Sequence, residues 1–106
     1  MSDEIEQIVA GTTSAGEIVT ITLCGEIDLL SADQLVSAVR DAVDTGAAHA
    51  VLDFADVVFV DSSGIAAMLT YWQKVPVTVR NRRPNVRRVM DVVGVDELLT
   101  IEDDAP

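Results

Sequence analysis

The residues best suited to chemistry in this chain are Asp61-Ser62-Ser63-Gly64, which stand between an apolar run ending at Val60 and a helical run starting at Ile65. A serine where a strand turns into a helix can serve as a nucleophile or can cap the exposed N–H groups of the helix. Nucleophilic serines need a histidine partner, yet the only histidine, His49, stands at the very start of a predicted strand without any pattern that would orient it. The flanking glycines of a nucleophile elbow are also missing, so we predict that the chain is not a hydrolase.

Other catalytic arrangements lack their parts. One histidine and one cysteine are too few for a zinc site, and no glycine-rich phosphate loop with a lysine occurs, so we expect no metal and no cofactor. Asp53 stands at the end of a predicted central strand, where receiver domains of response regulators carry their phosphoacceptor aspartate. Those domains also need a lysine after the last strand, and the only lysine is Lys74. We therefore predict that Asp53 closes its strand and hydrogen-bonds in the following loop, and that the protein is not an enzyme.

Length and charge limit the remaining possibilities. The 106 residues predict one domain over residues 1–106, with frayed ends at 1–3 and 102–106. A net charge of -11 argues against binding to nucleic acid or to an anionic membrane. No leader segment and no membrane-spanning apolar run is evident, which favours the cytoplasm. Cys24 has no second cysteine to pair with and is expected to be a small, partly buried side chain.

The basic residues are unevenly placed. Five of the seven basic residues lie between positions 80 and 88, without an acid among them: Arg80, Arg82, Arg83, Arg87 and Arg88. One interpretation is a solvated helix face whose arginines form surface ion pairs. The other is a docking patch for an acidic partner or ligand.

The hydrophobic pattern predicts strands alternating with helices. Residues 5–10 and 18–24 predict an antiparallel hairpin joined by the turn-rich stretch 11–16. A helix is expected to begin at Ser31, with Gln34 as its capping-box partner, a hydrophobic staple between Leu30 and Leu35, and Gly46 as its stop. Strands at 48–54 and 57–60, a helix at 62–73 and a strand at 77–79 follow. A helix opening at Pro84 and a strand at 98–101 complete the chain. This order predicts an α/β fold, a mostly parallel sheet with an antiparallel N-terminal strand and about three helices.

Several motifs, in this order along the chain, resemble a STAS domain of the bacterial anti-sigma factor antagonist family. They are Gly25-Glu26-Ile27-Asp28, the capped helix, Val51-Leu52-Asp53-Phe54, Val58-Phe59-Val60-Asp61-Ser62-Ser63-Gly64-Ile65, Pro84-Asn85-Val86-Arg87-Arg88-Val89-Met90 and Gly94-Val95. The resemblance covers nearly the whole chain.

The resemblance implies a switch between partners. In this family an anti-sigma factor that is also a serine kinase phosphorylates the first serine of the motif, here Ser62, and only the unphosphorylated antagonist binds the kinase and frees the sigma factor for transcription, often in a stress response. The neighbours expected to shape this site or contact the partner are Asp28, Ser31, Asp61, Ser63 and Gly64. A serine phosphatase would reverse the modification, and the protein is expected to be a monomer or a weak dimer. From the residues alone, Asp61, Ser62 and Ser63 compete for the helix cap.

Two further points remain open at this level. A scaffold or accessory STAS domain, in a stress-signalling assembly or beside a transporter ATPase, has the same fold and a serine that is never modified. The stretch from Gly64 to Pro84 is shorter than the family pattern, which predicts a second helix shortened by about a turn or more. Tyr71 and Trp72 are then expected either to cap the core at this corner or to form an exposed anchor for a partner.

Overall fold

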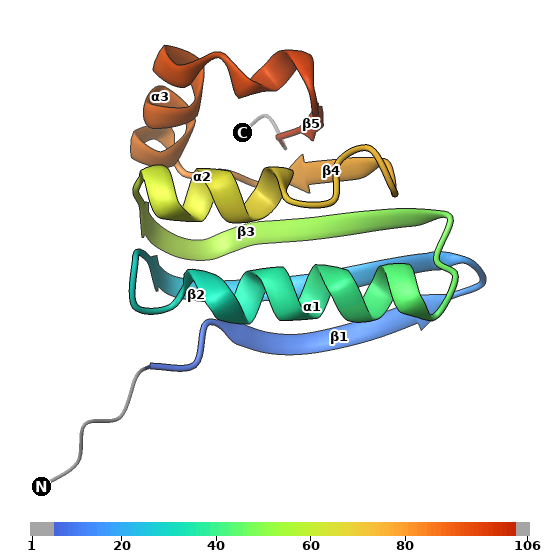
Figure 1. Cartoon of the computed structure of the whole chain (residues 1–106). Coiled ribbons are helices and arrows are strands. Elements are labelled where there is room, and N and C mark those ends of the chain that lie inside the picture. Colours follow the sequence, from blue (N-terminus) through green and yellow to red (C-terminus); the bar gives the residue numbers. More distant parts are fainter. Residues whose placement is uncertain (1–5, 104–106) are drawn as a thin grey trace, which may run out of the picture.

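Residues 6–103 are described by the structure, a computed structural model. One five-stranded sheet has the order β1-β2-β3-β4-β5, with β1 antiparallel to β2 and the other neighbours parallel, as Figure 1 shows. The elements are β1 (Val9–Ala15), β2 (Ile18–Ile27), α1 (Ala32–Asp44), β3 (His49–Val60), α2 (Ser62–Leu69), β4 (Val77–Arg80), α3 (Pro84–Val93), a short 3₁₀ turn (Val95–Glu97) and β5 (Thr100–Glu102). The predicted α/β fold with a mostly parallel sheet, an antiparallel first strand and three helices is confirmed.

The N-terminal hairpin is antiparallel as predicted, but its boundaries differ. The prediction put a strand at 5–10, of which residue 5 lies outside the described residues, and a six-residue turn at 11–16. Instead β1 covers 9–15 and only Gly16 and Glu17 form the turn, with Gly16 at φ 64 as a two-residue hairpin turn requires. Consecutive threonines favour a strand, and here they extend β1 through a stretch that composition alone assigned to a turn.

The core lies between the sheet and α1 and α2. Helix α1 buries Leu35, Val39 and Ala42, and α2 buries Ile65 and Met68. On the sheet, the largest fully buried side chains include Ile21, Leu23, Leu52 and Phe54. Gly46 and Gly94 end α1 and α3 as predicted, both with φ 83. Helix α2 has only 8 residues, so the predicted shortening is confirmed, but the predicted range of 62–73 was too long because the helix ends at Leu69.

The start of α1 is correct in position but not in chemistry. Ser31 is the N-cap residue, yet its side chain makes no capping hydrogen bond. The Gln34 side chain does not turn back to the helix start; its Oε1 accepts from the Ile8 N–H and its Nε2 donates to the Glu6 carbonyl, both at 2.8 Å. Leu30 is 70% exposed while Leu35 is buried, so no hydrophobic staple forms. Gln34 instead fixes the segment before β1 to α1.

Asp53 does not close a strand. It lies inside the 12-residue β3, which merges the two strands predicted at 48–54 and 57–60. The predicted local hydrogen bond does exist, because Asp53 Oδ1 accepts from the Ala55 N–H at 3.0 Å. Arg80 Nε lies 3.5 Å from the other carboxylate oxygen of Asp53. At the corner after α2, Tyr71 packs against the core, whereas Trp72 remains 39% exposed.

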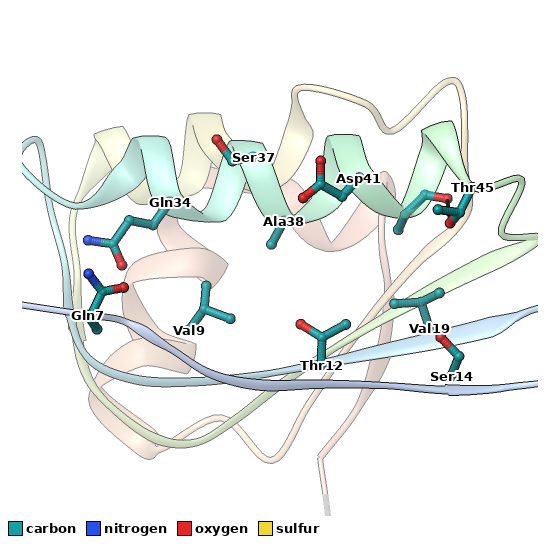
Figure 2. A pocket seen from close by; sticks show the side chains of 11 residues that line it. Gln7, Val9, Thr12, Ser14, Val19, Gln34, Ser37, Ala38, Asp41 and Thr45 are labelled. Atoms are coloured by element: carbon teal, nitrogen blue, oxygen red, sulfur yellow. Dashed lines mark hydrogen bonds between the residues drawn. The ribbon is translucent and has the colours of Figure 1, made fainter.

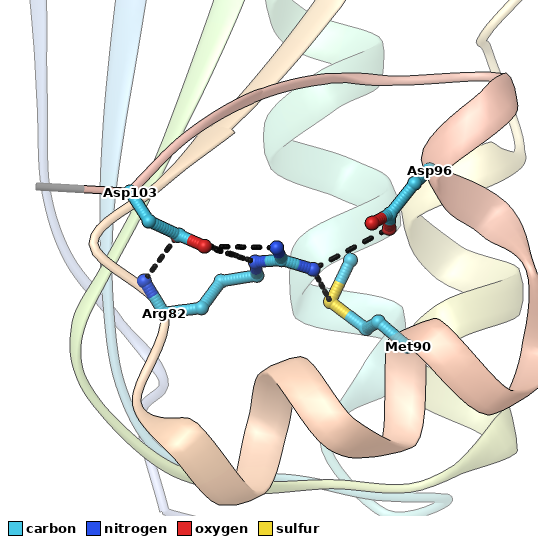
Figure 3. A network of polar contacts seen from close by, with 4 residues as sticks. All are labelled: Arg82, Met90, Asp96 and Asp103. Atoms are coloured by element: carbon cyan, nitrogen blue, oxygen red, sulfur yellow. Dashed lines mark hydrogen bonds and ion pairs between the residues drawn. The ribbon is translucent and has the colours of Figure 1, made fainter. Parts of the chain in front are cut away.

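The arginine cluster is divided between surface and interior. The interpretation of the cluster as one solvated helix face is therefore wrong for Arg82. This residue is 6% exposed, and its guanidinium donates to Asp103 at 2.8 Å and to Asp96 at 3.4 Å (Figure 3). The Arg82 N–H also donates to Asp103, at 2.9 Å. Glu102 in β5 and Asp103 are therefore ordered parts of the fold, contrary to the predicted fraying; residues 1–3 and 104–106 lie outside the described residues. Arg87 and Arg88 are exposed on α3.

The ion pair shifts the protonation of its members. Burial raises the pKa of Asp103, but hydrogen bonds from the side chain and N–H of Arg82 outweigh it, so this pKa lies below its ordinary value. Burial lowers the pKa of Arg82, and the hydrogen bond and charge of Asp103 outweigh that effect, so the pKa is raised. The pKa of Asp96 lies above its ordinary value, because burial and the neighbouring Asp91 raise it by more than the charge of Arg82 lowers it.

Candidate functional site

Asp61 is the residue that caps α2. Its backbone is extended, and its Oδ1 accepts from the N–H groups of Ser63 at 2.9 Å and Gly64 at 3.2 Å. Ser62 begins the helix, is exposed, and its hydroxyl has no hydrogen bond among residues 6–103. Of the three residues that competed for the cap, Asp61 therefore takes that role and Ser62 does not.

Gly64 lets the start of α2 approach the sheet closely. A Cβ at this position would lie 2.5 Å from Val60 Cγ2, 2.8 Å from Ile27 Cγ2 and 2.9 Å from the Ile27 carbonyl oxygen. Asp61 adds a backbone hydrogen bond, since its N–H donates to the same Ile27 oxygen at 3.2 Å. Ile27 and Val60 are partners at the carboxyl ends of β2 and β3. Ser62 is thus held by a helix start that is fixed to two strands.

The loop after β2 is held by Ser31. Its hydroxyl donates to the Glu26 carbonyl at 2.9 Å and accepts from the Asp28 N–H at 3.0 Å, and the side chain is buried. Asp28 Oδ1 in turn accepts from the Leu30 N–H at 3.0 Å. Both residues therefore hold the loop after β2 in shape, and Ser31 is only 3% exposed.

Four exposed apolar side chains, on the segments that end β2 and β3 beside the start of α2, were not identified from the sequence. Leu29 and Leu30, in the loop after β2, are 77% and 70% exposed, and Val58 and Phe59, near the end of β3, are 42% and 44% exposed. Phe59 pairs in register with Glu26, so the two segments leave the sheet side by side. We call Leu29, Leu30, Val58 and Phe59 the apolar rim. Leu-Leu directly before a helix N-cap was the available signal, but the staple interpretation placed Leu30 against the helix.

Residues 6–103 contain no group of three His, Cys, Asp or Glu side chains that could hold a metal ion. A groove of about 420 Å³ lies between β1 and α1, as Figure 2 shows, and none of the predicted site residues lines it. Within the described residues, no helix combines the length and apolar character needed to cross a membrane.

Comparison with known proteins gives the family. Residues 10–100 match the family model described as Mlab, STAS domain. No curated protein matches the chain.

Solved structures show the same fold at low identity. A candidate anti-sigma factor antagonist from Thermotoga maritima is 17% identical, with a TM-score of 0.79 over 90% of this chain and 86% of that one. An anti-sigma factor antagonist from Mycobacterium paratuberculosis is 23% identical, with a TM-score of 0.78 over 86% and 81% of the two chains. Unphosphorylated SpoIIAA, also an anti-sigma factor antagonist, is 24% identical, with a TM-score of 0.68 over 90% and 88%. Because the family model matches residues 10–100, most of its length, this chain belongs to the STAS domain family, and its sheet order and the helix start at Asp61 agree with that.

Proposed function

We propose that the protein is a cytoplasmic anti-sigma factor antagonist that works by partner switching, with Ser62 as its phosphorylation site. The observation that carries the proposal is the exposed hydroxyl of Ser62, which makes no hydrogen bond in residues 6–103, on a helix start fixed by Asp61 and Gly64. Structural likeness to SpoIIAA, solved in both unphosphorylated and phosphorylated forms, supports the assignment.

The chemistry of the switch is supplied by the partner. Ser62 Oγ attacks the γ-phosphorus of ATP held by a serine kinase, a P–O bond to ADP breaks, and a base of the kinase takes the hydroxyl proton. This chain contributes an exposed nucleophile in a fixed position. The cap survives the reaction because Asp61, and not the Ser62 hydroxyl, accepts from the helix N–H groups. The positive end of α2 also favours the added anion.

The apolar rim explains why the modified form would lose its partner. Exposed leucine and phenylalanine side chains on the segments beside the start of α2 suit an interface from which water is expelled. A phosphate adds about -1.5 to -2 charges there. In the free protein these charges stay hydrated, whereas in the complex they would be desolvated beside Asp61. The same modification therefore affects binding far more than folding.

We expect Ser62→Ala to bind the kinase as the wild type does, and Ser62→Glu to bind about a hundredfold more weakly, equivalent to about 2.7 kcal/mol. Calorimetric titration with each anti-sigma factor serine kinase of the source organism provides the measurement. Gln73→Glu, an exposed residue beyond the far end of α2, adds the same charge and should leave the affinity unchanged. Equal affinities of wild type and Ser62→Glu for the kinase that binds would sink the proposal.

We expect Leu30→Asp to weaken kinase binding by about thirtyfold or more, because it removes an apolar anchor and introduces a charge into a desolvated contact. Leu30 is 70% exposed, so thermal unfolding should change little. Val92→Asp serves as the matched control, since Val92 is 83% exposed on α3, outside the apolar rim. If both substitutions weaken binding equally, the rim is not the contact surface.

A second candidate is an accessory STAS domain whose serine is never modified. One finding favours it: the likeness to the murine Slc26a9 anion transporter, at 21% identity and a TM-score of 0.68. The match includes 88% of this chain but only 17% of the transporter chain. Mass spectrometry of Ser62 and Ser63 in cells, together with native sizing, separates the two functions. A phosphopeptide indicates the switch, whereas a stable large complex with unmodified serines indicates the accessory subunit.

A further inference from the structure

The two edges of the sheet are very different. At one edge, β5 has only three residues, includes Glu102, and continues into Asp103, which is anchored to Arg82. At the other edge, β1 has seven residues, and residues 7–16 contain no charge and no proline. Natural sheets blunt their edges with charges, prolines or very short strands. Strand β5 is blunted in this way, whereas the regular part of β1 is open to another strand.

The backbone groups at the open edge can be identified. In a hairpin closed by a two-residue turn, the residues next to the turn exchange backbone hydrogen bonds, and alternate residues direct theirs outward. The turn is Gly16-Glu17 and Ala15 pairs with Ile18, so Thr12 and Ser14 direct their N–H and C=O groups away from β2. The only irregularity in the pairing lies between Val9 and Gly11, which leaves residues 11–15 as a regular strand.

The groove of about 420 Å³ runs along this same edge (Figure 2). Thr12 and Ser14 line it from β1, and Ser37, Ala38 and Asp41 line it from α1. The edge therefore combines unpaired backbone groups with a partly filled space between strand and helix. A strand added beside β1 would form hydrogen bonds with the unpaired backbone groups and would also cover the groove between β1 and α1.

We propose that a second copy of this chain occupies the edge, with the two β1 strands antiparallel about a two-fold axis at Thr13. In this register Thr12 of each copy lies opposite Ser14 of the other, and these residues exchange their outward backbone hydrogen bonds. The Thr12 and Ser14 side chains form one row of hydroxyl groups between the two α1 helices, and the two grooves join. The result is a continuous ten-stranded sheet.

Charge favours this face over others for self-association. Each copy carries -11, so two copies repel wherever their acids meet. The uncharged residues 7–16 avoid such a meeting along the paired strands, where the register places Glu17 opposite Val9 of the other copy. Asp41 is the one acid that each copy brings to the lining of the joined grooves. The remaining repulsion is long-ranged and is screened by salt, with a Debye length of about 30 Å at 0.01 M and about 3 Å at 1 M. The dimer should therefore strengthen as salt is added.

Sedimentation at increasing protein concentration tests this dimer. We expect the average mass to rise towards twice that of one chain as the protein concentration increases. This rise should occur at a lower protein concentration in 1 M NaCl than in 0.01 M NaCl. Thr12→Pro removes an outward N–H that the monomer does not use, and should weaken association about tenfold or more. If circular dichroism shows that this variant does not fold, Thr12→Lys replaces it, with Gln73→Lys as the control for charge.

Disulfide trapping tests the register in a Cys24→Ala background. Thr13→Cys places two thiols on the axis, within the 4.4–6.8 Å Cα separation that disulfides accept. Thr20→Cys is the control, because Thr20 pairs with Thr13 on β2 and its copies would be about 14 Å apart, three strand spacings. We expect mild oxidation to cross-link Thr13→Cys and not Thr20→Cys. The proposal is overturned if the wild type stays monomeric at about 1 mM in high salt. It is also overturned if the Thr12 substitutions leave dimerisation unchanged, or if Thr13→Cys and Thr20→Cys cross-link equally.

Discussion

Gly64→Ala should destabilise the fold by about 3 kcal/mol. The added methyl group would lie 2.5 Å from Val60 Cγ2 and 2.9 Å from the Ile27 carbonyl oxygen. A side-chain methyl can rotate away, but a backbone carbonyl in a paired strand cannot, so α2 must move off the sheet. Chemical denaturation gives the free energy of unfolding, and the melting temperature should fall by more than about 10 °C.

Gly11→Ala is the matched control for this substitution. No atom lies within 4 Å of a Cβ built at Gly11, and its φ is not in the left-handed region. We expect a change within about 0.5 kcal/mol, as for ordinary surface substitutions. If Gly64→Ala is as mild as Gly11→Ala, then the start of α2 is not held tightly against Ile27 and Val60. The fixed presentation of Ser62 would then lose its structural basis.

Asp103→Ala should cost about 3 to 5 kcal/mol of stability, because it leaves the buried Arg82 guanidinium without its main partner. The Arg82 side chain is 2% exposed and that of Asp103 is 15% exposed, so solvent replaces the lost contacts poorly. Asp96 remains at 3.4 Å, but its side chain is 40% exposed. Glu102→Ala, one residue earlier and exposed, removes an equal charge and should have little effect.

The pH dependence of this loss follows from the lowered pKa of Asp103. The folded-state pKa lies below the unfolded value of about 3.9, so the folded protein holds its proton less tightly. The stabilisation is complete above the unfolded pKa and disappears as the pH falls through the folded one. Denaturation at pH 7 should show the full difference between wild type and Asp103→Ala, and denaturation near pH 2 a much smaller one. A difference that stays constant across this range contradicts the role of the charged carboxylate.

Much of the fold was predictable because its signals are local. Helical spacing of apolar residues located the three helices, and Gly46 and Gly94 marked the ends of α1 and α3. The short second helix also followed from the number of residues between Gly64 and Pro84. The errors occurred where distant residues compete for a side chain. Gln34 was predicted to cap its own helix, but it bonds to the segment before β1, which approaches only after folding.

The sequence by itself determined the α/β order of elements, the STAS resemblance and the position of the Asp-Ser-Ser-Gly segment, because residue type, periodicity and spacing carry these along the chain. Only the tertiary structure decided that Asp61 caps α2 while the Ser62 hydroxyl stays exposed, and that Arg82 is buried against Asp103. It also decided that Leu29 and Leu30 face solvent. Burial and pairing depend on which segments meet in space, and a pattern read along one chain cannot contain that information.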